Sequence, residues 1–134
     1  MAMSSNKSFF KCVLIAVSFL FSGVGAGAQS TRVMQLAKLE IDSTQLEPYA
    51  RFLKKGIETA LRLEPGVLML YAIADKDRPT HITILEIYAD TAAYRAHLQT
   101  SHFLEYKKAT AGMVKHLELV PVMALMPEGQ YLIR

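Results

Sequence analysis

The fold is decided by the stretch His81-Ile-Thr-Ile-Leu-Glu-Ile-Tyr-Ala-Asp90-Thr-Ala-Ala-Tyr-Arg-Ala-His97-Leu-Gln-Thr-Ser-His-Phe103. Its first part alternates, with Ile82 and Ile84 on one face, which predicts a strand over 81–89. Asp90 is a favourable helix N-cap, so a helical region is expected to begin beside it. Thr100-Ser101 offers a break in that region. The stretch therefore predicts a strand followed by a helix in two parts.

Two more elements precede this stretch. Residues 67–74 form a continuous apolar run that is too short for a surface helix, and this predicts an inner strand. The segment Glu64-Pro65-Gly66 ends a helix just before that run. The helix is expected to begin in a Thr44-x-x-Glu47 capping box and to bury one stripe. Apolar residues of the stripe recur at spacings of three and four: Leu46, Tyr49, Ala50, Leu53, Ile57, Ala60 and Leu61.

Both ends of the domain are predicted to be strands, over 32–41 and 117–126, and Pro121 in the second indicates a sheet edge or a bulge. The resulting order, β-α-β-β-α-β, predicts an α+β protein with a ferredoxin-like fold: one four-stranded antiparallel sheet with two helices on one face. The other face also carries apolar residues, and we expect a second copy to cover it in a homodimer. Residues 32–126 are taken as one domain and 127–134 as a C-terminal tail.

The first 28 residues have the three parts of a secretory signal peptide. Lys7 and Lys11 lie near the start, an apolar stretch covers 12–21, and small residues lead to Ala28. The apolar stretch is only about half of the roughly 20 residues that a membrane-spanning helix needs. We therefore expect cleavage near Ala28 and export to the periplasm or the medium, with membrane attachment only if the leader stays uncleaved.

Removal of this leader would leave 106 residues with 13 basic and 12 acidic side chains, a net charge of +1 instead of +3. A near-neutral chain without basic runs argues against nucleic-acid binding. The single cysteine, Cys12, would also be lost, which excludes a disulfide, a thiolate nucleophile and a cysteine-ligated metal from the remainder. His97 and His102 are five residues apart, about 140° around a continuous helix, so no metal site is expected.

Four motifs of the chain occur together in one protein family. They are the strand end Glu86-x-Tyr88, the capped helix start at 90–93, the run Tyr94-x-x-His97-x-x-x-Ser101-His102-Phe103, and the helix-ending Glu64-Pro65-Gly66. With these motifs, residues 32–126 resemble the antibiotic biosynthesis monooxygenase family, small dimeric α+β-barrel proteins that include quinol monooxygenases. The resemblance implies an oxygenase that acts on a small aromatic or quinol-type substrate without a bound cofactor.

His97 and Glu86 are the candidate catalytic residues. Glu86 lies in an otherwise apolar strand, where a carboxylate must find a partner. We expect it to pair with His97, on the inward face of the returning helix, and to hold one imidazole tautomer. Such a histidine is suited to take the proton of a phenol or quinol. The structural alternatives are a histidine that only caps packing and a Glu86 bound to Arg95 or Lys107.

The resemblance also implies a pocket for a flat aromatic molecule between helix and sheet. Its expected substrate-binding residues are Tyr71, Tyr94, His102, Phe103 and Tyr106, with His102 at the mouth. Aromatic residues at helical spacing are more often plain core, so the expectation of a pocket rests on the resemblance. Two other functions stay open: a noncatalytic small-molecule binding protein that uses the same pocket, and an isomerase, which would begin with the same proton abstraction.

Overall fold

A computed structural model describes residues 32–125, and the expected leader over 1–28 and tail over 127–134 lie outside the described residues. The elements are β1 (Val33–Ile41), the short 3-10 helix η1 (Ser43–Gln45), α1 (Leu46–Leu63), β2 (Val67–Ala74), β3 (His81–Tyr88), α2 (Thr91–His97), α3 (Ser101–Thr110) and β4 (Val114–Pro121). This order confirms the predicted ferredoxin-like α+β fold, with its second helix divided into α2 and α3. None of the helices within 32–125 is both long and apolar enough to cross a membrane.

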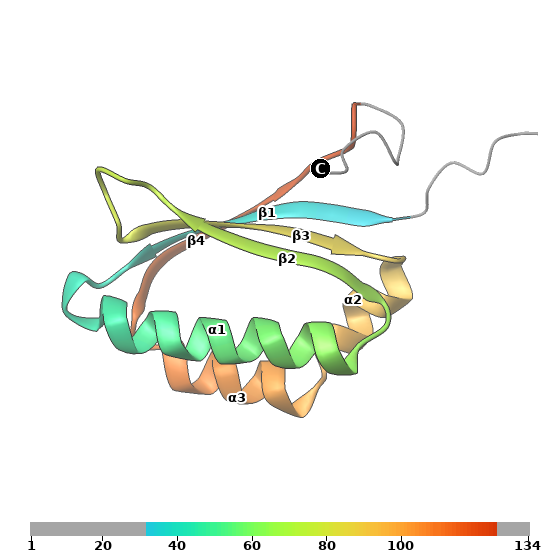
Figure 1. The fold of residues 1–134 in the computed structure, drawn as a ribbon, viewed down its shortest axis with the longest axis horizontal. Coiled ribbons are helices and arrows are strands. Elements are labelled where there is room, and N and C mark those ends of the chain that lie inside the picture. The colour runs from blue at the N-terminus through green and yellow to red at the C-terminus, as the bar shows by residue number, and fades with distance from the viewer. Residues whose placement is uncertain (1–31, 126–134) are drawn as a thin grey trace, which may run out of the picture.

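The four strands form one antiparallel sheet in the order β2-β3-β1-β4, with the helices together on one side of it (Figure 1). The prediction that residues 67–74 form an inner strand is wrong, because β2 lies at the sheet edge. A continuous apolar run indicates that both faces of a strand lie in apolar surroundings. It does not indicate whether the strand is hydrogen-bonded to one neighbouring strand or to two. Here Val67 packs under the helices, while Met69 and Tyr71 lie on the helix-free face.

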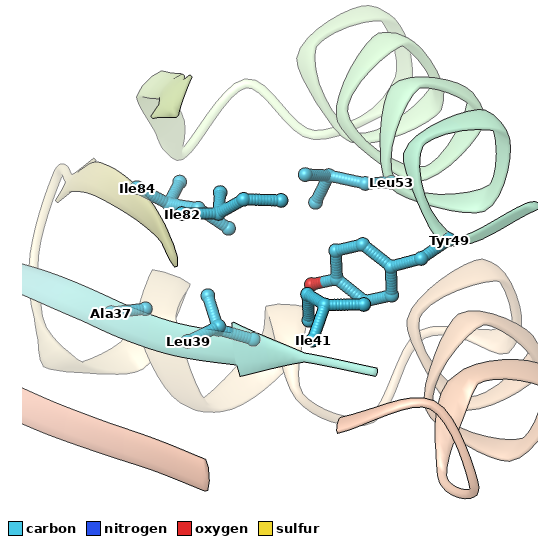
Figure 2. Packing of buried hydrophobic residues seen from close by; sticks show 7 residues of the cluster. All are labelled: Ala37, Leu39, Ile41, Tyr49, Leu53, Ile82 and Ile84. Carbon is cyan, nitrogen blue, oxygen red and sulfur yellow. The ribbon is translucent and has the colours of Figure 1, made fainter. Parts of the chain in front are cut away.

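The main core lies between α1 and the helix-facing side of β1 and β3 (Figure 2). Ala37 and Leu39 of β1 stand opposite Ile84 and Ile82 of β3 in the strand register. Tyr49 of α1 has no exposed surface and closes this core from the helix side. Burial of each such large side chain contributes about 1.5–3 kcal/mol. The pattern of spacings in α1 thus predicts its buried stripe correctly at Tyr49, Leu53 and Ala60, whereas Ala50 and Leu61 at the margins of the stripe are exposed.

Local hydrogen bonds define the helix starts, and one of the two predicted caps is wrong. The backbone N–H of Thr44 donates to Asp42 at 2.8 Å, so Asp42 caps η1 and α1 follows without a side-chain cap. The Thr44 hydroxyl donates to the same carboxylate at 2.6 Å, and this bond, followed by the backbone one, lowers the pKa of the Asp42 carboxyl below its ordinary value. Asp90 caps α2 as predicted, because its carboxylate accepts from the N–H of Ala93 at 2.8 Å. Thr100 in the same way caps α3.

The last strand also differs in part from the prediction. It occupies 114–121 rather than 117–126, and Pro121 is its final residue. Because β4 is an edge strand, the edge position predicted from Pro121 is confirmed. The irregularity in the β1–β4 pairing lies between Glu40 and Ile41 instead.

Candidate active site

A cavity of about 390 Å³ lies between the helices and the sheet. Its floor comes mainly from apolar side chains of β1, β3 and β4, and its roof from α1 and α3. Leu117 and Leu119 of β4 line it and are 41% and 47% exposed, although they pair with core positions of β1. The cavity is therefore open along β4, where a small ligand can enter. A mainly apolar cavity of this size with a few polar groups is typical of a small-molecule site.

Glu86 supplies one polar group of the cavity wall. Its carboxylate accepts a hydrogen bond from the Gln35 side-chain amide at 2.6 Å and one from the Tyr88 hydroxyl at 3.1 Å. Gln35 stands directly opposite Glu86 on the neighbouring strand, so the register of the sheet places the Gln35 amide beside the Glu86 carboxylate. Burial, followed by the charge of Glu86, raises the pKa of Tyr88, which therefore stays protonated and continues to donate. The predicted pairing of Glu86 with His97 is wrong, because the partners of Glu86 are Gln35 and Tyr88 and Nδ1 of His97 bonds to Glu64.

His97 instead bonds to Glu64, the residue that follows α1. Nδ1 of His97 lies 2.9 Å from Glu64 Oε1, and Nε2 of His102 lies 2.6 Å from the same oxygen. The side chains of Glu64 and His97 are only 13% and 7% exposed, and that of His102 is 17% exposed. The three residues thus form a nearly buried cluster of two imidazoles around one carboxylate.

The helix break explains why His97 and His102 meet. The angle of about 140° expected between them holds only for a continuous helix. In the structure α2 ends at His97 and α3 begins at Ser101, so the two residues lie on separate helices. Their ligand-type nitrogens and the Glu64 carboxylate all lie within 4.8 Å of one another. The reason for expecting no metal site is therefore wrong, and these three residues are the ones in the cavity region that could hold a metal ion.

The turn Glu64-Pro65-Gly66 fixes the position of this cluster. A Cβ atom on Gly66 would lie 2.5 Å from the Cβ of Ala93 in α2, so only glycine allows this approach. The carbonyl of Gly66 also accepts a hydrogen bond from the N–H of Ala89 at 2.8 Å. The end of α1 is thereby held against the start of α2, which places Glu64 beside His97.

Hydrogen bonding assigns the tautomer of His97. A carboxylate can only accept, so Nδ1 carries the proton and donates to Glu64. In a neutral imidazole Nε2 is then the unprotonated nitrogen. Every fully buried side-chain nitrogen or oxygen in the described part of the chain has a hydrogen-bond partner, and Nε2 has none there. Nε2 is therefore accessible, and because His97 lines the cavity, we place this basic nitrogen at the cavity wall.

Aromatic rings surround His97 and complete the wall. The ring of Phe103 lies 4.8 Å from that of His97, and the ring of Tyr88 lies 5.5 Å from it. Tyr94 packs on Tyr88 at 5.1 Å, and Tyr106 bonds through its hydroxyl to Tyr49 at 2.7 Å. Contacts of this kind hold the imidazole in place.

Most of the predicted substrate-binding residues line the cavity. These are Tyr94, His102, Phe103 and Tyr106, and the predicted catalytic residues His97 and Glu86 line it as well. Tyr71 does not. Its side chain is 62% exposed on the helix-free face, opposite Leu85 in the register. The prediction that Tyr71 binds substrate in the pocket is therefore wrong. An apolar run such as 67–74 gives no sign of which alternate residues face the helices.

Comparison with known proteins agrees with this geometry. The sequence model of the family called antibiotic biosynthesis monooxygenase matches residues 32–109. The chain belongs to the antibiotic biosynthesis monooxygenase family. A crystal structure of a candidate antibiotic biosynthesis monooxygenase from Bacteroides thetaiotaomicron is 51% identical, with a TM-score of 0.72, over 73% of this chain and 93% of that chain.

Two further solved structures extend the comparison. A candidate monooxygenase from Lactobacillus acidophilus is 32% identical, with a TM-score of 0.69, over 72% of this chain and 46% of that one. A candidate antibiotic biosynthesis monooxygenase from Nitrosomonas europaea has a TM-score of 0.69 over 75% of this chain and 97% of that one, and its 22% identity shows the fold alone. No protein of curated function matches the sequence.

The sequence does not indicate two residues of the site in this member of the antibiotic biosynthesis monooxygenase family, Glu64 and Gln35. The segment Glu64-Pro65-Gly66 predicts only a helix stop, and it carries no local sign that Glu64 meets a partner from another helix. Gln35 was placed in a strand without a role, yet it is 8% exposed and faces the cavity. The sequence signal for Gln35 is a polar residue between Met34 and Leu36 in an otherwise mostly apolar part of the strand.

Proposed function

We propose that the protein is a monooxygenase that oxidises a small aromatic or quinol-type substrate in the cavity without a bound cofactor, with His97 as general base. The observation that carries the proposal is the hydrogen bond from Nδ1 of His97 to Glu64, which leaves Nε2 as the unprotonated nitrogen of a residue that lines the cavity. This is the arrangement in which a carboxylate fixes the imidazole tautomer and a free ring nitrogen takes a substrate proton.

The proposed reaction uses electrons from the substrate itself. Nε2 of His97 takes a proton from a quinol hydroxyl, and the resulting anion passes one electron to dioxygen. The two radicals combine at a ring carbon, and the peroxide anion takes the proton back from His97. Loss of the ring hydrogen together with hydroxide then releases water and leaves a carbonyl. One quinol and one dioxygen thus give one hydroxyquinone and one water.

The charge of Glu64 supports the first step of this sequence. When Nε2 takes the proton, His97 becomes a cation beside a nearly buried carboxylate 2.9 Å away, and that contact stabilises the ion pair. The contact is largely shielded from solvent, since the side chains of His97 and Glu64 are 7% and 13% exposed. Glu86 is already bonded to Gln35 and Tyr88, so we assign it a second role: its remaining lone pairs would orient a substrate hydroxyl.

Labelled dioxygen tests this function. The full chain is incubated with a panel of naphthoquinols and phenols under ¹⁸O₂, and the products are analysed by mass spectrometry against buffer alone. We expect one ¹⁸O atom in the product and the other in water. A product isomeric with the substrate and free of ¹⁸O would identify an isomerase. Ligands that raise the melting temperature without any turnover would identify a binding protein.

We also propose that the protein is exported and works as a homodimer. On the helix-free face Met69, Tyr71 and Ile73 are 41%, 62% and 52% exposed, which is unusual for one strand of a monomer. A second copy placed sheet against sheet would cover these side chains. Light scattering at micromolar concentration should give twice the mass of one chain. The Ile73→Lys variant should give the mass of one chain. A wild-type monomer would contradict the dimer.

A further inference from the structure

We propose that Glu64, His97 and His102 form a binding site for a divalent transition metal ion such as Zn²⁺, at the edge of the cavity. The three residues come from three elements: the end of α1, the end of α2 and the first turn of α3. Their ligand atoms lie within 4.8 Å of one another. The proposal goes beyond the oxygenase function and does not require it.

The donor set has the chemistry that such an ion prefers. Two imidazole nitrogens and one carboxylate oxygen bind zinc in many proteins and leave a fourth position open for water. The same set of two histidines and one carboxylate also suits other divalent ions of the first transition series. A hard ion such as Mg²⁺ or Ca²⁺ would find only one oxygen ligand here, because both other donors are nitrogens. The site therefore discriminates between these two classes of metal.

Small side-chain movements would complete the coordination. Zinc ligands at roughly 2.0–2.2 Å in a tetrahedral arrangement are about 3.3 Å apart. The two nitrogens now lie 2.9 Å and 2.6 Å from Glu64 Oε1, so each must move away from this oxygen by less than 1 Å. All the ligand atoms lie within 4.8 Å of one another, so any wider gap among them must close by at most about 1.5 Å. His102 is the least buried of the three and has the freedom to make this change. The hydrogen-bonded arrangement is the metal-free form of the site.

The surroundings hold the ligands ready for an ion. The ring of Phe103 at 4.8 Å and the ring of Tyr88 at 5.5 Å fix the imidazole of His97. The contact of Gly66 with Ala93 fixes the turn that carries Glu64. Both hydrogen-bond partners that the structure shows for the nearly buried Glu64 carboxylate are imidazoles, so a bound cation would compensate a charge that burial makes costly. Ligands positioned in this way reduce the entropy lost on binding.

Metal binding would change what His97 presents to the cavity. A neutral imidazole that binds metal through Nδ1 carries its proton on Nε2. The nitrogen at the cavity wall would then be a hydrogen-bond donor instead of an acceptor. If His97 is the general base that we propose, the ion would switch it off. This consequence rests on the proposed function, whereas the binding itself does not.

Calorimetric titration of the tag-free full chain with Zn²⁺, after treatment with a chelator, tests the site. We expect one ion per chain, and Mg²⁺ should give no heat of binding. His102→Gln should weaken zinc binding by more than the roughly 10–100-fold that loss of an outer-shell partner costs. His116→Gln is the matched control, because His116 is exposed on β4, and it should leave the affinity unchanged. No saturable binding, or binding lost in His116→Gln and kept in His102→Gln, would overturn the proposal.

Imidazole ¹⁵N spectra of the wild-type chain give a test that needs no variant to fold. On addition of Zn²⁺, the proton of His97 should move from Nδ1 to Nε2, and the signals of His102 should shift at the same stoichiometry. The signals of His81 and His116 should stay in place. Shifts confined to His81 and His116 would show a different site. Because neither measurement uses turnover, failure here would leave the oxygenase proposal standing, and inactivity in the ¹⁸O₂ assay would leave the metal site standing.

Discussion

Replacement of Glu64 by glutamine separates the tautomer role of this carboxylate from a purely structural one. The wild-type oxygen accepts two hydrogen bonds, of 2.9 Å from His97 and 2.6 Å from His102. A glutamine amide carries no charge, so both imidazoles lose their carboxylate partner even where the one amide oxygen still accepts a hydrogen bond. Hydrogen bonds to a charged group are worth about 1.5–3 kcal/mol each. We expect Glu64→Gln to reduce the free energy of unfolding by about that amount.

The effect on turnover should be larger than the effect on stability. Without the carboxylate, Nδ1 no longer has to carry the proton, and Nε2 is unprotonated in only part of the molecules. Loss of an orienting carboxylate lowers the rate by as much as about 10⁴ in the serine protease triad, and general-base catalysis contributes about 10²–10⁴. We therefore expect a fall in kcat of about 10²–10⁴ with a small change in KM.

Three measurements on Glu64→Gln check this reasoning: urea unfolding, dioxygen uptake with a quinol, and ¹⁵N spectra of His97. The matched control is Glu86→Gln, which removes the charge that Gln35 and Tyr88 contact but leaves the partner of His97 intact. That control should keep the Nδ1–H tautomer. A Glu64→Gln protein with wild-type kcat, or with the His97 proton still on Nδ1 in every molecule, would refute the assigned role of Glu64.

Two further predictions concern the framework of the site. Gly66→Ala should destabilise the fold by about 1–3 kcal/mol, because the added methyl group meets Ala93 at 2.5 Å. Gly112→Ala is the control and should leave the stability unchanged, because no atom lies within 4 Å of the added methyl group. Equal midpoints of urea unfolding for the two variants would argue against the close approach of Gly66 to Ala93. Burial raises the pKa of Tyr49 and Tyr88 above the ordinary 10, so unfolded chains ionise first and stability is lost as the pH rises above 10. The loss should be about 1.4 kcal/mol per tyrosine at pH 11, and Tyr49→Phe should flatten the alkaline slope in urea unfolding.

Local signals in the sequence predict most of the fold. The alternation over 81–88 and the cap at Asp90 depend on neighbouring residues, and both are confirmed. The position of β2 in the sheet is not a local property, so the apolar run over 67–74 predicts neither its edge position nor the face on which Tyr71 lies. The predicted cap at Thr44 is wrong for another reason. Asp42 accepts the hydrogen bond from the Thr44 backbone N–H, which the capping box would use, and a 3-10 turn begins there.

The site could be predicted only in part. The sequence indicates His97 and Phe103 as cavity residues, since both lie on the inward side of a helix with clear caps. The partner of His97 lies 33 residues away at the end of another helix, so its identity depends on how α1 packs against α2. The approach of His102 to His97 could have been inferred from the break at Thr100. The angle of about 140° between the two histidines applies only to a continuous helix, and the break ends that helix before His102. The contact of Gly66 with Ala93 has no signature in the sequence beyond the Pro-Gly turn.

The rate of dioxygen uptake by His97→Ala tests the central claim most directly, namely that His97 is the base of an oxygenase reaction in this cavity. The full chain and the variant are compared with a quinol that the wild type oxidises, with buffer subtracted and with His116→Ala as control. We predict a loss of about 10²–10⁴ for His97→Ala, wild-type rates for the control, and partial rescue of the variant by added imidazole. Equal uptake by His97→Ala and the wild type would contradict the account.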